Sequence, residues 1–203
     1  MSSIDIHQTA ILEGEIVFEG NHVKIGPYAV LSGNVILGDN VEIGAGSCIG
    51  QKAEHRERIG EEGVLLASNI IIRENVVIHS GLVTPTVIGN GAFLMSGSYV
   101  AHDCILEDGI TLSSGVRLAG HSHVMKYANL GMGAMVHQYG VVGSYSMVGM
   151  GTVVTKNSRI EPGMKYAGVP AKFLSRNSWA LEKHEVQAEE LAKETDRFYS
   201  LFS

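Results

Sequence analysis

The chain has 203 residues, enough for one ordinary domain with a real hydrophobic core and a small appendage. Its formal net charge of -6 and its lack of a Lys/Arg cluster give no basic surface for nucleic acid or for an anionic membrane. Two distant cysteines, Cys48 and Cys104, and a start that is neither basic nor continuously apolar predict a cytoplasmic protein without a signal peptide.

Large aliphatic residues recur every sixth position along most of the chain. In the first quarter they are followed by Gly or Ser, at Ile25, Leu31, Leu37, Ile43 and Ile49. Farther on the interval holds without a miss, at Ile88, Leu94, Val100, Leu106, Leu112, Leu118, Val124, Leu130, Val136, Val142, Val148, Val154 and Ile160. Neither a helix nor a simple strand has this period. Short strands joined by tight corners do, so the period predicts a β-solenoid, although it does not fix its hand.

The interval is broken in two places and then stops. The breaks fall near 51–65, where residues 51–58 are charged, and near 79–87, and both predict loops ejected from a corner. We expect the solenoid to span 1–170 and a helical extension to span 171–203. Ser178 is the expected N-cap of that helix. Its expected stripe is Leu181, His184, Ala188, Leu191, Thr195, Phe198 and Phe202. The uncharged stretches 75–102 and 127–155 are interrupted by polar residues too often to span a membrane.

The aliphatic-Gly-x4 repeat resembles that of the hexapeptide-repeat acyltransferases. The resemblance implies an all-β fold, a left-handed parallel β-helix, which departs from the usual right-handed crossover, with a short C-terminal α-helical tail. In that family three hexads make one triangular coil, so residues 18 apart stack at about 4.8 Å. On such a coil His102, His121 and His137 lie along one edge, within roughly 10 Å. Nine histidines also allow accidental stacking at exposed corners.

Three segments sharpen the resemblance. Ala101-His-Asp-Cys104, Leu118-Ala-Gly-His121 and Gly131-Met-Gly-Ala-Met-Val-His-Gln138 resemble the UDP-N-acetylglucosamine O-acyltransferases of lipid A synthesis in order and spacing, and 73–81 resembles their upstream segment. The resemblance implies a homotrimeric acyltransferase. It would move an acyl group from an acyl-carrier-protein or coenzyme A thioester to a hydroxyl or amine of a nucleotide-linked sugar, with no tightly bound cofactor and no metal.

A sugar hydroxyl is a poor nucleophile until a base removes its proton, and imidazole has a suitable pKa for that task. We therefore expect His102 to be the general base and Asp103 to orient it. By the family's pattern, the N–H of Gly120 stabilises the oxyanion. The same pattern assigns substrate binding to His121, His137, Gln138, His79 and Tyr99.

The chain also departs from that family. Residues 51–58 stand where the family has an Asp-Leu-Lys loop that holds the sugar, and Tyr99 stands where a second histidine is common. Met150, with Met132 in the same predicted acyl-chain pocket, occupies the floor where long-chain enzymes have Gly, which predicts a short or medium acyl group. The segment 166–172 resembles that of coenzyme A acetyltransferases, and a Pro-bearing exit from the last coil explains it equally well.

Two other interpretations remain open. A γ-class carbonic anhydrase shares the solenoid and holds zinc with three histidines, but the spacing of His102, His121, His123 and His137 does not match its two close histidines. A non-catalytic scaffold would scatter polar residues over all corners, whereas this sequence concentrates His, Asp and Gln on one edge.

Overall fold

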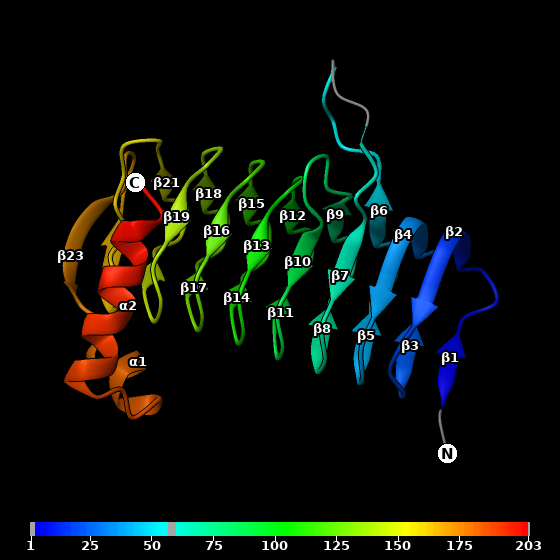
Figure 1. Cartoon of the computed structure of the whole chain (residues 1–203), viewed down its shortest axis with the longest axis horizontal. Coiled ribbons are helices and arrows are strands. Elements are labelled where there is room, and N and C mark those ends of the chain that lie inside the picture. The colour runs from blue at the N-terminus through cyan, green and yellow to red at the C-terminus, as the bar shows by residue number, and fades with distance from the viewer. Residues whose placement is uncertain (1–2, 57–59, 203) are drawn as a thin grey trace.

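Most of the chain winds into a three-sided parallel β-solenoid (Figure 1). The computed structural model describes residues 3–56 and 60–202. Coils pair in parallel with a register of 18 residues, as where Phe93 pairs with Thr111 and Thr111 with Asn129. Figure 1 places the N-terminus at one end of the solenoid and the helical tail at the other. Residues 18 apart therefore become neighbours along an edge, as the hexapeptide resemblance implies.

The strands line three faces. The first face contains β1 (Ile4–Ile6), β3 (Val23–Ile25), β5 (Val41–Ile43), β8 (Ile70–Ile72), β11 (Phe93–Leu94), β14 (Thr111–Leu112), β17 (Asn129–Leu130), β20 (Met147–Val148), β22 (Met164–Ala167) and β23 (Lys172–Arg176). The second contains β7 (Val64–Leu66), β10 (Thr86–Ile88), β13 (Ile105–Leu106), β16 (His123–Val124) and β19 (Val141–Val142). The third contains β6 (Cys48–Gln51), β9 (Val77–His79), β12 (Tyr99–Val100), β15 (Arg117–Leu118), β18 (Met135–Val136) and β21 (Val153–Val154). The longer β2 (Ile11–Phe18) and β4 (Val30–Leu37) run through the corner between the last two faces.

The aliphatic residues at every sixth position form the hydrophobic core of the solenoid. Every aliphatic position of the series from Ile88 to Ile160 is buried, and so are the small residues beside it, such as Cys104, Ser122 and Ala128. Fully burying one such aliphatic side chain stabilises the fold by about 1.5–3 kcal/mol. Because each coil contributes three of them, the core runs the length of the solenoid and holds its corners in fixed positions.

Two segments leave the solenoid at neighbouring places. One lies between β6 and β7 and projects beyond the prism in Figure 1, and the other lies between β9 and β10. Part of the first, 57–59, lies outside the described residues. The two segments pack together, since the Gly63 N–H donates to Ser80 Oγ at 2.9 Å and the Gly81 N–H to Gly63 O at 3.1 Å. They meet beside the corner that carries His102 and Asp103.

The C-terminal part differs in three details from the expectation. Residues 172–176 are the strand β23, antiparallel to β22, and the helical region is two helices, α1 (Ser178–Lys183) and α2 (Ala188–Ser200). The break follows from Glu185, whose φ of 52° ends α1. Ser178 is the first helical residue, and the N-cap is Asn177, whose side chain donates to Tyr145 O instead of capping.

Helix α2 packs on the last coils through Phe198, which lies against Met125 and Val141. Glu107 anchors it by accepting hydrogen bonds from His123, at 2.5 Å, and from Arg197. Burial favours the neutral acid, but these two partners lower the pKa of Glu107 to about 2. In the described part of the chain, no helix has the length and apolarity needed to cross a membrane.

Candidate functional site

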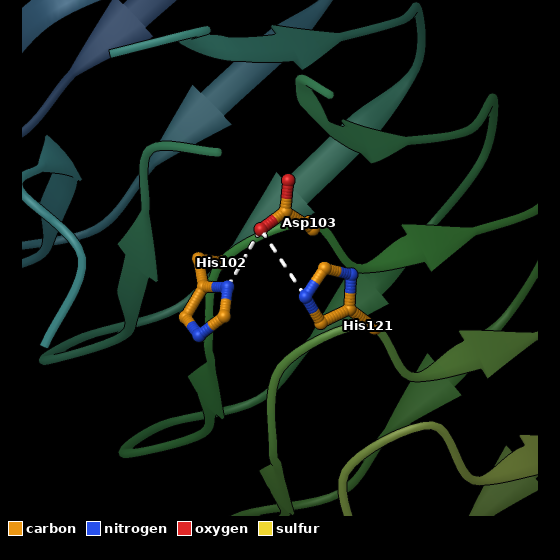
Figure 2. Close-up of side chains that lie close together, drawn as sticks. All are labelled: His102, Asp103 and His121. Atoms are coloured by element: carbon orange, nitrogen blue, oxygen red, sulfur yellow. Dashed lines mark hydrogen bonds and ion pairs between the residues drawn. The ribbon is translucent and has the colours of Figure 1, made fainter. Parts of the chain in front are cut away.

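His102 and Asp103 form a short, buried pair in the corner between β12 and β13. His102 Nδ1 lies 2.6 Å from Asp103 Oδ2, and Figure 2 shows the ring edge turned toward the carboxylate. The Asp103 side chain is fully buried, and one tenth of the His102 side chain is exposed. A bond this short between a ring nitrogen and a carboxylate is a charge-assisted hydrogen bond. Adjacent residues can face each other because Asp103 has a left-handed φ of 58°, a conformation that Asp adopts more readily than most residues.

The carboxylate of Asp103 is held by the second ejected segment. Its Oδ1 accepts three backbone N–H groups, from Leu82 at 3.1 Å, Val83 at 2.7 Å and Thr84 at 2.8 Å. Burial alone would raise the pKa of Asp103, but these donors and His102 lower it to about 2. Asp103 is therefore ionised at neutral pH. An ionised carboxylate at Nδ1 keeps the proton on that nitrogen and leaves Nε2 of a neutral His102 as a proton acceptor.

Asp103, His121 and Tyr139 occupy the same corner position in three successive coils, each with a φ near 60°. His121 Nε2 lies 3.7 Å from the same Asp103 Oδ2, and its ring is 5.2 Å from that of His102 (Figure 2). Tyr139 stacks on His121 at 4.6 Å between ring centroids. Sequence reasoning missed Tyr139, although its position 18 residues after His121 was a sufficient signal.

Gly120 lies directly against the His102 ring. A Cβ at this position would come within 2.6 Å of both Cε1 and Nε2 of His102, so any larger residue would displace the imidazole. Within residues 3–56 and 60–202, no acceptor pairs with the Gly120 N–H. A backbone donor on a residue that packs against the general base can stabilise a developing oxyanion.

His137 and Gln138 lie at the same corner one coil farther on, where the N–H of Tyr139 donates to Gly120 O at 3.1 Å. The His137 side chain is exposed, and its Nδ1 bonds to Gln138 O at 2.9 Å. Among the described residues, neither side chain has a hydrogen bond or a ring contact with His102 or Asp103. His137 and Gln138 thus lie at the expected corner, next to the buried His102–Asp103 pair and not hydrogen-bonded to it.

Two of the expected substrate ligands, His79 and Tyr99, lie on the third face before the corner. Their rings are 5.3 Å apart, and both contact the first ejected segment. That segment also brings in His55, whose ring meets the His102 ring edge-on at 6.0 Å. Sequence reasoning assigned no role to His55, because the hexad register stops where the segment leaves the solenoid.

Met132 and Met150 are not part of this constellation in a single chain. They follow β17 and β20 of the first face, at another corner from His102, and are 54% and 69% exposed. The chain alone therefore does not form the expected acyl-chain pocket next to the His102–Asp103 pair.

The chemistry of the corner favours proton transfer. His102, Asp103 and His121 could each offer one metal ligand, and those atoms lie within 4.8 Å of one another. However, 2.6 Å between Nδ1 and Oδ2 is a hydrogen-bond contact, shorter than the roughly 3.3 Å between two ligands of one tetrahedral zinc ion. The adjacent thiol of Cys104 is buried, which raises its pKa to about 12, so it is no nucleophile at neutral pH.

The chain is similar to known acyltransferases. Residues 20–51 and 85–120 match the family model for the bacterial transferase hexapeptide (six repeats). A 107-residue region is 33% identical to the acyl-[acyl-carrier-protein]–UDP-N-acetylglucosamine O-acyltransferase of Thiobacillus denitrificans, covering 53% of this chain and 41% of that protein. The same enzyme of Alkalilimnicola ehrlichii is 32% identical over 116 residues, 57% of this chain and 44% of the relative. The match thus spans less than half the length of these curated relatives.

Solved structures extend the similarity to nearly the whole chain. The UDP-N-acetylglucosamine acyltransferase of Campylobacter jejuni superposes with a TM-score of 0.78 and 26% identity, covering 97% of this chain and 81% of that one. The enzyme of Moraxella catarrhalis gives 0.70 and 27%, covering 94% and 82%. The chain therefore has the left-handed parallel β-helix fold, and part of it matches the hexapeptide-repeat transferases. Its sequence and structure are similar to those of the UDP-N-acetylglucosamine O-acyltransferases.

Proposed function

We propose that the protein transfers an acyl group from an acyl-carrier-protein or coenzyme A thioester to a hydroxyl or amine of a nucleotide-linked sugar. UDP-N-acetylglucosamine is the first acceptor to test, since relatives are named for it. The observation that carries the proposal is the buried His102–Asp103 pair with the Gly120 backbone against the imidazole. It supplies a base, its orienting group and an oxyanion donor within one corner.

The reaction follows from these three groups. Nε2 of His102 takes the proton of the acceptor hydroxyl while that oxygen bonds to the thioester carbonyl carbon. The carbonyl oxygen becomes an oxyanion beside the Gly120 N–H. When the intermediate collapses, the carbon–sulfur bond breaks, and the thiolate leaves with the proton from the imidazolium. Asp103 stabilises the imidazolium between these steps and remains ionised.

His121, with Tyr139 stacked on it, the exposed His137 and the half-buried Gln138 extend along the same corner. In the proposed function they bind sugar hydroxyls and the phosphate side of the nucleotide, since each offers hydrogen-bonding groups near the base. Met132 and Met150 lie at a different corner from His102. We therefore propose that the protein forms a homotrimer in which a neighbouring chain brings its two methionines to His102. Met150 then shortens the acyl pocket, and a short or medium chain is the proposed donor.

The test is turnover of the purified protein with UDP-N-acetylglucosamine and donors of graded chain length on carrier protein and on coenzyme A. His102→Ala should lower the rate by about 10²–10⁴-fold in a protein that still unfolds cooperatively, because the base is lost while the aliphatic core is kept. His22→Ala, at an exposed corner far along the solenoid, should leave the rate unchanged. Full turnover by the folded His102→Ala variant, or none by the wild type with any donor, would refute the proposal.

A further inference from the structure

The sheet of the first face has an unpaired strand edge at each end of the solenoid. This 10-stranded sheet runs from β1 to β23, so within the described part of the chain each of these two strands pairs with one neighbour only. Figure 1 shows β1 and β23 at opposite ends of the molecule. Helix α2 packs on Val141 of the second face and leaves the outer edge of β23 uncovered. The free backbone N–H and C=O groups of such an edge can pair with a strand of another chain.

Apolar side chains are exposed at both of these edge strands. Ile4 and Ile6 of β1 are 44% and 39% exposed, although their partners in β3 are buried in the core. Paired residues of neighbouring strands point to the same side of a sheet, so the two isoleucines point toward the core. At the other end, Phe173 of β23 pairs with the buried Tyr166 and is 58% exposed. The core is therefore open at both ends of the first face, and a second chain stacked end to end would cover it.

The two ends carry opposite charges. Residues 3–22 contain no Lys or Arg and four acidic residues, all of them exposed: Asp5, Glu13, Glu15 and Glu19. Residues 164–176, which form the hairpin of β22 and β23, contain no Asp or Glu and three basic residues: Lys165, Lys172 and Arg176. Contact between two like ends would bring charges of one sign together, whereas unlike ends attract each other.

The strand directions also fit contact between unlike ends. The strands of the first face run parallel from β1 to β22, and β23 runs antiparallel to β22. Because β1 and β23 end the same face, a second copy moved along the solenoid axis places its β1 beside β23. The two strands are then antiparallel, and such strands pair through short hydrogen bonds perpendicular to the chains.

We propose that copies of this chain stack head to tail, with the basic end formed by β22 and β23 of one copy on the acidic end formed by β1 and β2 of the next. In this contact β23 pairs with β1 of the second copy, and Phe173 covers Ile4 and Ile6 of that copy. The contact joins two different surfaces and does not close on itself, so it repeats along the axis. It goes beyond the proposed function, because none of its residues takes part in the proposed reaction.

Sedimentation velocity of the purified protein at increasing concentration measures this association. The average mass should rise with concentration, and less so when salt is raised from about 0.05 M to about 0.5 M, because salt screens the attraction. Lys172→Glu combined with Arg176→Glu reverses the charge of the basic end and should weaken the association by at least about tenfold. Lys183→Glu combined with Lys193→Glu, at exposed positions of the helices, is the matched control. It makes the same change in net charge and should leave the association within about twofold of wild type.

Reversal of the acidic end distinguishes head-to-tail stacking from contact between like ends. Glu13→Lys combined with Glu15→Lys should weaken the association as much as reversal of the basic end. A mixture of the two reversed proteins should form pairs and no longer stacks, because the acidic end left in one protein meets the basic end left in the other. A wild-type mass that does not change with concentration would overturn the proposal. So would association that only one of the two reversals weakens, or a mixture that forms no pairs.

Discussion

Gly120 offers a direct test at the scale of one residue. Alanine would place a Cβ 2.6 Å from His102 Nε2 and push the imidazole away from Asp103. We expect Gly120→Ala to lower kcat by at least about 10²-fold, the contribution of a positioned base. Gly133→Ala is the matched control, because Gly133 has open space around its Cβ position but a φ of 66°. That control should cost about 1 kcal/mol of stability and keep kcat, measured by denaturant unfolding and steady-state kinetics. Equal kcat losses in both variants would contradict the packing argument.

The lowered pKa of Asp103 predicts that the protein loses stability in acid. Its pKa is lowered from 3.8 to about 2 in the folded protein, so its ionised form favours folding at pH values above 3.8. That contribution, about 2 kcal/mol, is lost as the pH falls through 3.8 towards 2. The free energy of unfolding of the wild type should therefore fall more on acidification than that of Asp103→Asn.

The measurement is urea unfolding of both proteins at pH values from about 6 to about 2. Asp5→Asn, at an exposed position in β1, controls for removal of one carboxyl group. Parallel stability curves for wild type and Asp103→Asn would show that the three backbone donors do not hold the carboxylate as the structure indicates.

At the residue scale, the sequence was sufficient to predict where residues lie if they follow the six-residue register. It was insufficient for residues in segments that leave the register. His102, Asp103, Gly120 and His121 could be placed together because they fall on one corner of an 18-residue coil. His55 could not be placed, since its position depends on hydrogen bonds from His79 and Tyr99 of the third face to Lys52 and Glu54. The six-residue period does not predict those bonds.

At the scale of elements, the segment between β9 and β10 works as a clamp on Asp103. A Cβ at Gly81 would lie 1.7 Å from Thr84 O, so Gly81→Ala must open the turn that aims three N–H groups at the carboxylate. We expect the variant to lower kcat by about tenfold or more, because His102 loses its fixed partner. Val83→Ala is the control, as its side chain is 56% exposed and its N–H is retained. Unchanged kcat in a folded Gly81→Ala variant would exclude the clamp.

Comparison of the solenoid with the tail shows which elements the sequence could predict and which it could not. The aliphatic ladder predicted the solenoid because burying one large side chain per hexad is a requirement that every coil repeats. The tail has no such requirement. Its helical stripe predicted neither the hairpin of β22 and β23 nor the break at Glu185, beside which His184 packs on Tyr127 and Tyr145.

At the scale of the whole molecule, the proposed catalytic and acyl-binding residues of one chain stand at different corners. His102 follows β12 of the third face, whereas Met150 follows β20 of the first. A rigid solenoid cannot fold one corner onto another. If both serve one reaction, each site must combine His102 of one chain with Met150 of a neighbour. The separation of His102 and Met150 within one chain is the physical reason for proposing a trimer.

Mixed assemblies test that arrangement. His102→Ala removes the base, and Met150→Trp should fill the acyl pocket, so each variant alone should be inactive. Co-expressed with different affinity tags in equal amounts and purified through both tags, they should recover about a third of wild-type activity. In every mixed trimer, of either composition, one of the three interfaces pairs an intact His102 with an intact Met150. Purifying the two variants separately and mixing them without exchange is the control. Activity in the co-assembled sample no higher than in that control would show that the two residues do not share a site across chains.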